Sequence, residues 1–290
     1  MKVGFLTVVN ERSVDPASLA RKAEELGFES VWVPDHPIIP VHTSTPLPES
    51  QPGQGGIPEI YSHMSDPFVA MSMMAAVTTR LKVGTGVCLI PERHPLITAN
   101  EVATLDAFSD GRVLFGIGAG WLKEESEILG GDFPHRWSQT REYIQAMREL
   151  WTKDEASFEG KYVKFPPVKL YPKPVRKGGP PVLIGSKDRN ALRWTARWGD
   201  GWCPIFYSAT EMKTHLAKLR EECNAVGRDF SQLDITIFKR ELRGDRGAVQ
   251  AGLQEYAAAG VHRFVLMLMG TRLDRQSCAG ELERLAALYI

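Results

Sequence analysis

The chain has 290 residues and an ordinary globular composition, with 43% hydrophobic and 24% charged residues. Its 35 basic and 35 acidic side chains leave a formal net charge of zero. No global field therefore favours nucleic acid or an anionic membrane surface, and we expect neither as a partner.

The cysteines and the apolar runs restrict the class further. The four cysteines occur without a CxxC or His-rich spacing, so we expect neither a metal site nor a disulfide framework; they are Cys88, Cys203, Cys223 and Cys278. The N-terminal run MKVGFLTVV lacks a cleavage site, and no apolar run approaches the roughly 20 residues of a membrane span. These features predict a cytoplasmic protein.

Strand-like and helix-like segments alternate along the chain. Buried strands are predicted at 2–9, 30–33, 81–90, 112–121, 180–186, 201–206, 234–238 and 263–269. Helices are predicted at 16–26, 68–79, 96–108, 123–129, 137–151, 189–198, 211–226, 248–259 and 273–288. Asp15-Pro16 and Asp66-Pro67 are typical helix starts, while Gly27, Gly227 and Gly260 are typical stops.

Eight such strands alternating with helices predict a (β/α)8 TIM barrel formed by one domain, residues 1–290. An open doubly wound sheet would have a phosphate-binding glycine motif after its first strand, and residues 7–10 contain none. Two insertions interrupt the repeat. The Pro-, Gly- and Ser-rich segment at about 37–66 follows a strand end and is predicted to be a lid, and residues 154–172 are predicted to include a hairpin.

Barrel enzymes place their active sites at the C-terminal ends of the strands, and two strand ends carry polar groups of interest. Asp35-His36 follows the second strand, as a functional pair or as a capped turn with a structural histidine. Gly185-Ser186-Lys187 precedes a helix, whose N-terminus favours an anion, although an ordinary turn explains it equally well.

The stretch Arg112–Trp121, RVLFGIGAGW, places glycines at alternate positions of a strand. Alternate residues share one face, so Gly116, Gly118 and Gly120 are predicted to clear that face for a flat, flavin-like ring. Their spacing differs from the dinucleotide-binding GxGxxG motif.

Together these segments resemble the bacterial luciferase-like superfamily of flavin and deazaflavin oxidoreductases. The resemblance rests on AEELGFESVWVPDH, VGTGVCLIPERHP, ATLDAFSDGRVLFGIGAGW and PPVLIGS…ARWGDGW. Within the superfamily the chain is most similar to the probable coenzyme F420-dependent oxidoreductases. The motifs are specific for the superfamily and much less specific for the cofactor.

The resemblance implies a role for each matched strand end. His36, paired with Asp35, would lie beside the reactive part of the ring and take part in proton transfer. Thr85 and the Gly86-Val87 pair would back the ring, with a non-prolyl cis peptide between Gly86 and Val87.

The resemblance also implies how the rest of the cofactor is held. Gly118 and Gly120 would lie beneath the cofactor side chain, and Gly185, Ser186 and Lys187 would lie near its phosphate. Trp121 stands where a sugar-phosphate dehydrogenase branch has an acidic Glu, so that specificity is not carried over. Trp121 is predicted to stack on substrate or ring, with core packing as the alternative.

The expected reaction is hydride transfer between coenzyme F420 and a small organic substrate, with His36 as the acid–base group. An FMN-dependent monooxygenase using reduced flavin and O₂, with a cofactor-reducing partner enzyme, is the close alternative. A binding protein without turnover, or a cofactor-free lyase or isomerase using Asp35 and His36, also stays open.

Two further expectations concern the surface. A basic path for the oligoglutamate tail of F420 is predicted from Lys173, Arg176, Lys177, Lys187, Arg189 and Arg193, although charged side chains of this kind also form ordinary solvated surfaces. A homodimer is expected by analogy, with helix 68–79 as its face.

Overall fold

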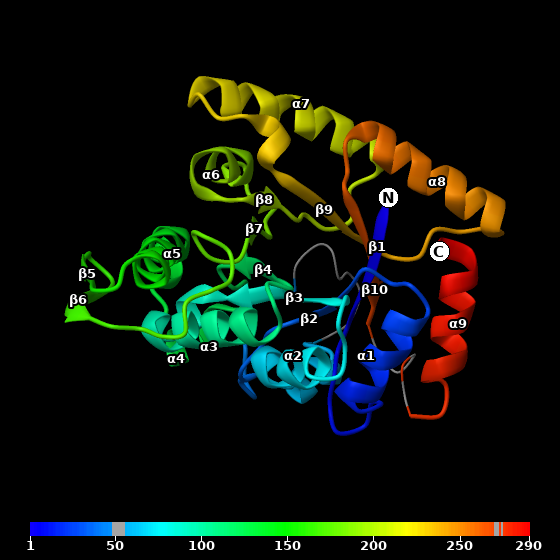
Figure 1. Ribbon diagram of the computed structural model, residues 1–290, viewed down its shortest axis with the longest axis horizontal. Helices are drawn as coiled ribbons and strands as arrows, with labels where there is room; N and C mark the ends of the chain where they lie inside the picture. Colours follow the sequence, from blue (N-terminus) through cyan, green and yellow to red (C-terminus); the bar gives the residue numbers. More distant parts are fainter. Residues whose placement is uncertain (48–55, 270–272, 274) are drawn as a thin grey trace.

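The computed structural model describes residues 1–47, 56–269, 273 and 275–290. Its main sheet is a closed barrel with the strand order β1-β10-β9-β8-β7-β4-β3-β2, in which all neighbouring strands are parallel. Helices surround the barrel on the outside (Figure 1). The predicted TIM barrel is confirmed.

The elements follow the predicted alternation. The barrel strands are β1 (Lys2–Thr7), β2 (Ser30–Val33), β3 (Lys82–Leu89), β4 (Val113–Gly118), β7 (Val182–Ile184), β8 (Gly201–Trp202), β9 (Asp234–Lys239) and β10 (Arg263–Leu268). The α-helices are α1 (Pro16–Glu25), α2 (Pro67–Ala75), α3 (Pro95–Phe108), α4 (Lys123–Ile128), α5 (Arg136–Thr152), α6 (Ala191–Trp198), α7 (Ala209–Ala225), α8 (Arg246–Ala259) and α9 (Cys278–Tyr289). Short 3-10 helices are η1 (Glu59–His63), η2 (Ile90–Glu92), η3 (Phe133–His135) and η4 (Phe230–Gln232).

Local capping explains why several boundaries were predictable. The Asp15 carboxylate accepts from the Ser18 amide at the start of α1, and Pro16 occupies the first turn, where its missing N–H costs nothing. Asp66 caps α2 in the same way. Gly260 ends α8 with φ 100°, a left-handed conformation that suits glycine.

Other boundaries differ from the prediction. The strand predicted at 201–206 is regular only at Gly201–Trp202, because Pro204 has no N–H to donate to the sheet; pairing resumes as one bridge between Ile205 and Phe238. The helix predicted at 68–79 ends at Ala75. The last helix begins at Cys278 rather than 273, and residues 270–272 and 274 lie outside the described residues.

The two insertions take different forms. Strands β5 (Ala156–Glu159) and β6 (Lys164–Val168) form the predicted antiparallel hairpin, which projects away from the barrel beside α5 (Figure 1). Between β2 and α2 the described residues contain η1, a helical turn that the sequence did not predict. Residues 48–55 of the predicted lid lie outside the described residues.

Strand β10 closes the barrel by pairing with β1 along its whole length, from Lys2 opposite Arg263 to Thr7 opposite Leu268. The interior of the barrel is filled by large side chains, including Trp32 and Phe238, whose rings meet edge to face at 5.2 Å. Gly84 makes room for Trp32, since a methyl group there would come within 2.5 Å of the indole. This packing gives the C-terminal end of the barrel a solid floor.

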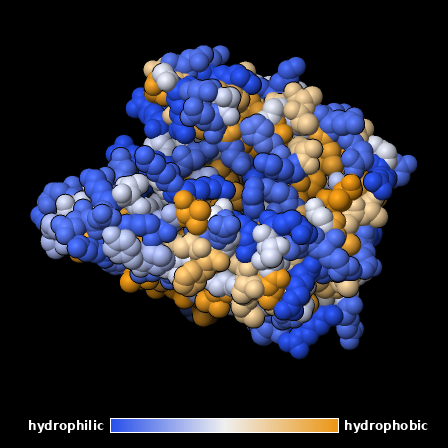
Figure 2. Space-filling model, in the orientation of Figure 1, coloured by the Kyte–Doolittle hydropathy of each residue, from blue (hydrophilic) through white to orange (hydrophobic). Residues whose placement is uncertain are grey.

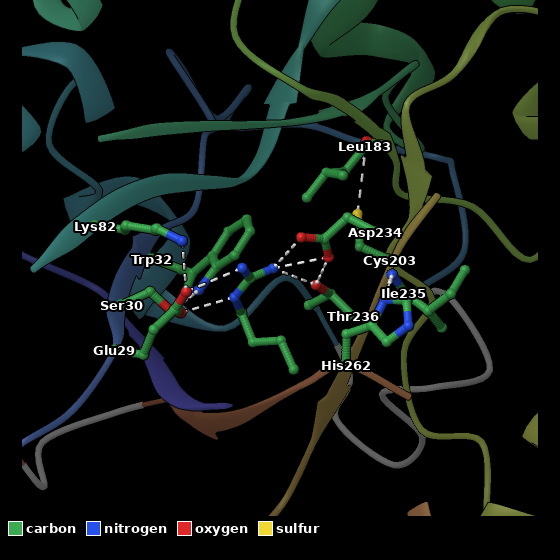
Figure 3. Close-up of polar contacts among 11 residues, drawn as sticks. Glu29, Ser30, Trp32, Lys82, Leu183, Cys203, Asp234, Ile235, Thr236 and His262 are labelled. Carbon is green, nitrogen blue, oxygen red and sulfur yellow. Dashed lines mark hydrogen bonds and ion pairs between the residues drawn. The ribbon is translucent and has the colours of Figure 1, made fainter. Parts of the chain in front are cut away.

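A buried ion-pair cluster closes the opposite, N-terminal end. Arg263 is fully buried and donates to both oxygens of Glu29 and both oxygens of Asp234, at 2.7–3.0 Å. It also donates to Thr236 Oγ1, and Lys82 bonds to Glu29 at 3.0 Å. Figure 3 shows the Glu29 and Asp234 carboxylates facing one another across this contact, with Lys82 beside Glu29. Burial alone would raise the pKa of Glu29, but the hydrogen bonds and charges of Arg263 and Lys82 lower it to about 2.

None of the helices in the described ranges is both long enough and apolar enough to span a membrane.

Candidate active site

A cavity of about 980 Å³ opens at the C-terminal ends of the barrel strands. Five of the predicted site residues line it, namely Asp35, His36, Gly86, Val87 and Trp121. Its other walls come from the ends of β1 and β10, from the segment around η1, and from residues 240–244 after β9. This is the end of the barrel at which the sequence placed the site.

His36 is held by hydrogen bonds at both ring nitrogens. Its Nδ1 lies 2.6 Å from Oε2 of Glu125, which is fully buried on α4. Its Nε2 accepts from the indole N–H of Trp121 at 3.3 Å. The ring is therefore fixed in orientation by two side chains that follow β4.

The rings of His36, Tyr61 and Trp121 pack against one another. Tyr61, from η1, lies 5.1 Å from the imidazole centroid, and Trp121 lies 5.9 Å from it. Tyr61 and Trp121 are 6.3 Å apart, nearly perpendicular. The described part of the predicted lid therefore packs against the histidine, and Trp121 contacts His36 rather than packing only in the core.

Asp35 is fully engaged by protein groups. It accepts from Nε and Nη2 of Arg93 at 2.9 and 2.8 Å and from the Leu89 amide at 3.0 Å. Arg93 also bonds to Asp66 at the start of α2, at 2.8 Å. Asp35 therefore ties the end of β2 to the end of β3, which suits a positioning residue better than a catalytic base.

Two buried carboxyl groups, Glu125 beside His36 and Glu92 beside Gly120, were not identified from the sequence. Neither oxygen of Glu92, and not Oε1 of Glu125, has a hydrogen-bond partner among the described residues. Burial, then the charges of Glu125 and Asp35, raise the pKa of Glu92 to about 9, with Arg93 offsetting only part of the effect. Glu92 therefore carries its proton at neutral pH.

A signal for one of these groups was present in the sequence. Leu122 and Leu129 lie three residues before and four residues after Glu125, so the helical period places Glu125 on their apolar face. A carboxylate on the apolar face of a short helix that follows a barrel strand is a recognisable pattern. For Glu92, in the loop PERHP, no comparable signal exists.

The end of β3 forms the predicted bulge. The Gly86–Val87 peptide bond is cis, and the pairing of β3 with β4 shifts register between Thr85 and Cys88. Thr85 is buried and donates to the Gly116 carbonyl at 2.7 Å, so its side chain faces the sheet.

The glycines of RVLFGIGAGW make room for protein rather than for open space, which corrects the sequence-based interpretation. A methyl group on Gly118 would come within 2.7 Å of the Val87 side chain, and one on Gly116 would collide with the Thr85 carbonyl. Gly120 lies beyond β4, with φ 77°, and its missing side chain leaves space for the Glu92 carboxyl. The glycines therefore accommodate the bulge of β3 and a buried acid. A contact of Gly118 or Gly120 with a cofactor stays a prediction.

The predicted phosphate-proximal turn lies outside the walls of the main cavity. The missing side chain of Gly185 gives space to Val87, and Ser186 accepts from the Asp188 amide at 3.0 Å. Lys187 lies over the Tyr207 ring at 4.4 Å. Helix α6 begins four residues later without a side-chain cap, so its first amides are free of side-chain acceptors.

The predicted basic path is wrong as a continuous feature. Arg176 donates to the carbonyl of Gly111, which precedes β4, and Lys173 donates to carbonyls at the end of α5. Gly111 belongs to the N-terminal end of the barrel, whereas Lys187, which follows β7, belongs to the C-terminal end. The six basic residues therefore do not lie along one path.

With this geometry in place, comparison with known proteins assigns the family. The model of the luciferase-like monooxygenases matches residues 12–263. The chain belongs to the luciferase-like monooxygenase family. The resemblance drawn from the motifs is confirmed.

Two relatives align with almost the whole chain. An uncharacterised protein of Mycobacterium tuberculosis is 37% identical over 288 residues, covering 99% of this chain and 98% of the relative. An F420-dependent glucose-6-phosphate dehydrogenase of Amycolatopsis mediterranei is 30% identical over 296 residues, covering 99% and 80%.

Solved structures share the fold at low sequence identity. The coenzyme F420-dependent tetrahydromethanopterin reductase from Methanopyrus kandleri matches with a TM-score of 0.75 and 18% identity, covering 99% of this chain and 98% of that one. The oxygenating constituent of 3,6-diketocamphane monooxygenase from Pseudomonas putida, in complex with FMN, matches with a TM-score of 0.66 and 19% identity, covering 88% and 71%. Proteins that share this fold therefore include an F420-dependent reductase and a monooxygenase constituent in complex with FMN.

Proposed function

We propose that this protein transfers a hydride between coenzyme F420 and a small organic substrate, with His36 as the acid–base group. The observation that carries the proposal is the mounting of His36 in the wall of the cavity, with Nδ1 bound to Glu125 and Nε2 beside Trp121. The F420 dependence of the Amycolatopsis relative supports the choice of cofactor.

The cavity fits a flavin-type ring. Its volume of about 980 Å³ lies within the range of ligand pockets, and its lining combines apolar side chains with a few polar groups. In the proposal Gly86 and Val87 back the ring, with Thr85 anchoring their strand and Asp35 fixing the neighbouring one. When bound, the deazaflavin supplies a hydride donor or acceptor at C5.

The rest of the cofactor is proposed to lie along the ends of the next two barrel strands. Gly118 and Gly120 would contact its side chain. Gly185, Ser186 and Lys187 would hold its phosphate, supported by the uncapped start of α6.

The residues around the cavity act on the substrate. In one direction His36 takes a proton from the substrate through Nε2, and in the reverse direction it returns that proton. A positioned acid–base group of this kind contributes about 10²–10⁴-fold to the rate. Trp121 and Tyr61 flank the imidazole and exclude water from it when substrate is bound.

An FMN-dependent monooxygenase is the second candidate, because a protein of the same fold is known in complex with FMN. A titration of the purified protein with F420 and with FMN under identical conditions, followed by absorbance, separates the two. The proposal expects tighter binding of F420 and reduction of the bound deazaflavin by a substrate. Tighter binding of FMN, with O₂ consumption by the reduced enzyme, would replace it.

The same titration tests the remaining alternatives. Binding without reduction by any donor would indicate a binding protein, and no binding of either cofactor would leave a cofactor-free lyase or isomerase. His36→Ala is expected to bind F420 as the wild type does and to lose at least about 100-fold in turnover. His42→Ala, an exposed histidine nearby in the chain, is the control.

We also propose a homodimer through α2 and α3. Figure 2 shows apolar side chains along the lower edge of the molecule, over these two helices. Val69 and Met73 on α2, and Ile97 and Phe108 on α3, are large apolar residues exposed by 44–83%. Sedimentation equilibrium tests this, with Phe108→Glu expected to yield monomers. A cytoplasmic location and, for an FMN enzyme, a reductase partner stay predictions.

A further inference from the structure

The environment of Nδ1 of His36 is unusual for a group so close to a cavity. Glu125 comes from α4, follows β4 by a few residues, and has no exposed surface. Its Oε2 lies 2.6 Å from Nδ1, while its Oε1 is buried without a hydrogen-bond partner among the described residues. Burying a carboxyl group in this way costs free energy of folding, so we expect the group to have a function.

Trp121 fixes which nitrogen carries the proton. An indole N–H can only donate, so Nε2, which faces it at 3.3 Å, is an acceptor. In the neutral imidazole the proton is then on Nδ1, where it is donated to Glu125. The nitrogen with a lone pair is the one beside Trp121 in the cavity wall.

Glu92 sets the charge behind this pair. Its carboxyl fills the space left by the missing side chain of Gly120 and lies within electrostatic range of Glu125. Since Glu92 holds its proton at neutral pH, the space shared by Glu92 and Glu125 does not hold two negative charges. Glu125 is therefore the carboxyl group that faces His36, with a neutral Glu92 within electrostatic range of it.

The other charged groups packed around Glu92 and Glu125 are already paired. Asp35, at the end of β2, is neutralised by Arg93 after η2. Arg136, at the start of α5, donates to the carbonyls of Gly120 and Phe133 rather than to either glutamate. Neither Arg93 nor Arg136 takes the place of His36 as the partner of Glu125.

We propose that Glu125 is a positioning residue for proton transfer at His36, holding the proton on Nδ1 and stabilising the imidazolium. This inference rests on the proposed acid–base role of His36. Only a proton moves in the step concerned: the substrate displaces the Trp121 N–H from Nε2, its proton passes from the heteroatom to the freed lone pair of Nε2, and the proton returns in the reverse reaction. Nδ1 keeps its own proton throughout.

The first test reads the tautomer of His36 in the protein without cofactor. Imidazole ¹⁵N NMR of the wild type is expected to show the Nδ1–H form. In Glu125→Gln the amide can turn either its N–H₂ or its oxygen toward Nδ1, so only the 3.3 Å contact with Trp121 still favours Nδ1–H, and the Nε2–H form is expected to become detectable. Glu125→Asp, which retains a carboxylate, is expected to recover the preference in part. An unchanged tautomer in Glu125→Gln would overturn the inference.

The second test uses turnover with F420. Glu125→Gln is expected to lower kcat by roughly 10²–10⁴-fold while the KM for substrate and the Kd for F420 change less than about threefold. Glu127→Gln, an exposed position on the same helix, is the matched control and is expected to be neutral. Equal losses in both variants, or a loss in Kd rather than kcat, would overturn the positioning role.

The third test isolates Glu92. The wild type is expected to change kcat as pH rises through about 9, where Glu92 ionises, and Glu92→Gln is expected to lack that transition. A transition of equal size in both proteins would show that Glu92 does not set the charge behind His36.

These tests separate the inference from the function on which it rests. Full activity in His36→Ala would refute the acid–base role, whatever the tautomer result. If neither F420 nor FMN bound, the ¹⁵N measurement in the cofactor-free protein would still decide whether Glu125 holds the proton on Nδ1.

Discussion

At the N-terminal end of the barrel Arg263 lies between two carboxylates, and all three of its guanidinium nitrogens donate hydrogen bonds to them. At the C-terminal end Glu92 and Glu125 are just as buried, yet three of their four oxygens have no partner among the described residues. Both ends place ionisable groups in a low-dielectric interior, where an unpaired polar group is costly. The N-terminal end of the barrel, here called its base, is arranged for stability. The C-terminal end, here called its mouth, retains buried groups that stability alone would eliminate, as expected for an active site.

The largest expected effect on stability comes from Glu92, at the mouth of the barrel. Glu92 has a folded pKa of about 9 against 4.5 for the free side chain, so it binds a proton in the folded state that the unfolded state releases. Its contribution to stability is therefore complete below pH 4.5 and falls as pH rises to 9, by at most about 6 kcal/mol. Glu92→Gln removes this dependence, so its advantage over the wild type should grow across that range. Urea unfolding at several pH values measures it, and parallel curves for the two proteins would contradict it.

The next largest effect is expected when Arg263 is removed from between its two carboxylates at the base of the barrel. Arg263→Met leaves the partly buried Glu29 and Asp234 without their buried cation and is expected to lower the free energy of unfolding by about 3–5 kcal/mol at pH 7. Arg284→Met removes a cation with two carboxylate partners from a more exposed position and is the control, expected to cost under about 1 kcal/mol. Similar losses in the two variants would mean that burial of the cluster has no special effect.

Glu29, at the base of the barrel, gives stability a pH dependence of opposite sign to that given by Glu92, and a third variant removes it. Glu29 has a pKa lowered from 4.5 to about 2, so its contribution of about 3 kcal/mol is present above pH 4.5 and is lost as pH falls to 2. Glu29→Gln should therefore be less stable than the wild type at pH 7 and should approach it near pH 2. Acid unfolding monitored by circular dichroism tests this, and a deficit that stayed constant down to pH 2 would disagree with it.

The smallest effect is expected from Lys82, which lies at the partly exposed edge of the ion-pair cluster. Lys82 bonds to Glu29 with about a quarter of its side chain exposed, so the pair is screened by water. Lys82→Met is expected to cost under about 1 kcal/mol in thermal unfolding. A loss as large as that of Arg263→Met would show that the base depends on its outer cation as much as on its inner one.

The same contrast explains what could be predicted from the sequence. The barrel was predictable because each strand and helix carries its own local signal, such as Asp15-Pro16 before α1 or Gly260 after α8. His36, Asp35 and the bulge at Gly86–Val87 were found because they follow strands in recognisable motifs.

The missing parts depend on contacts between distant segments. Glu125 and His36 are 89 residues apart, and neither spacing nor periodicity pairs them. The three glycines after Leu114 were correctly singled out, but for a different reason, since the neighbouring strand and Glu92 occupy the space that they leave. A pattern of small residues indicates close approach without indicating what approaches.

The pairing of Arg263 with Glu29 spans 234 residues, which has a consequence for how the chain is made. At a synthesis rate of about 5–20 residues per second, Glu29 leaves the ribosome on the order of 10 to 50 seconds before its partner. Until β10 arrives, β1 presents an open sheet edge, a surface prone to aberrant pairing. The last strand then covers that edge, neutralises Glu29 and, through Met267 and Leu268, adds to the cavity wall. The nascent chain therefore acquires its neutralised ion-pair cluster and the β10 part of its cavity wall together, and α9 adds Arg284 and Leu288 to that wall afterwards.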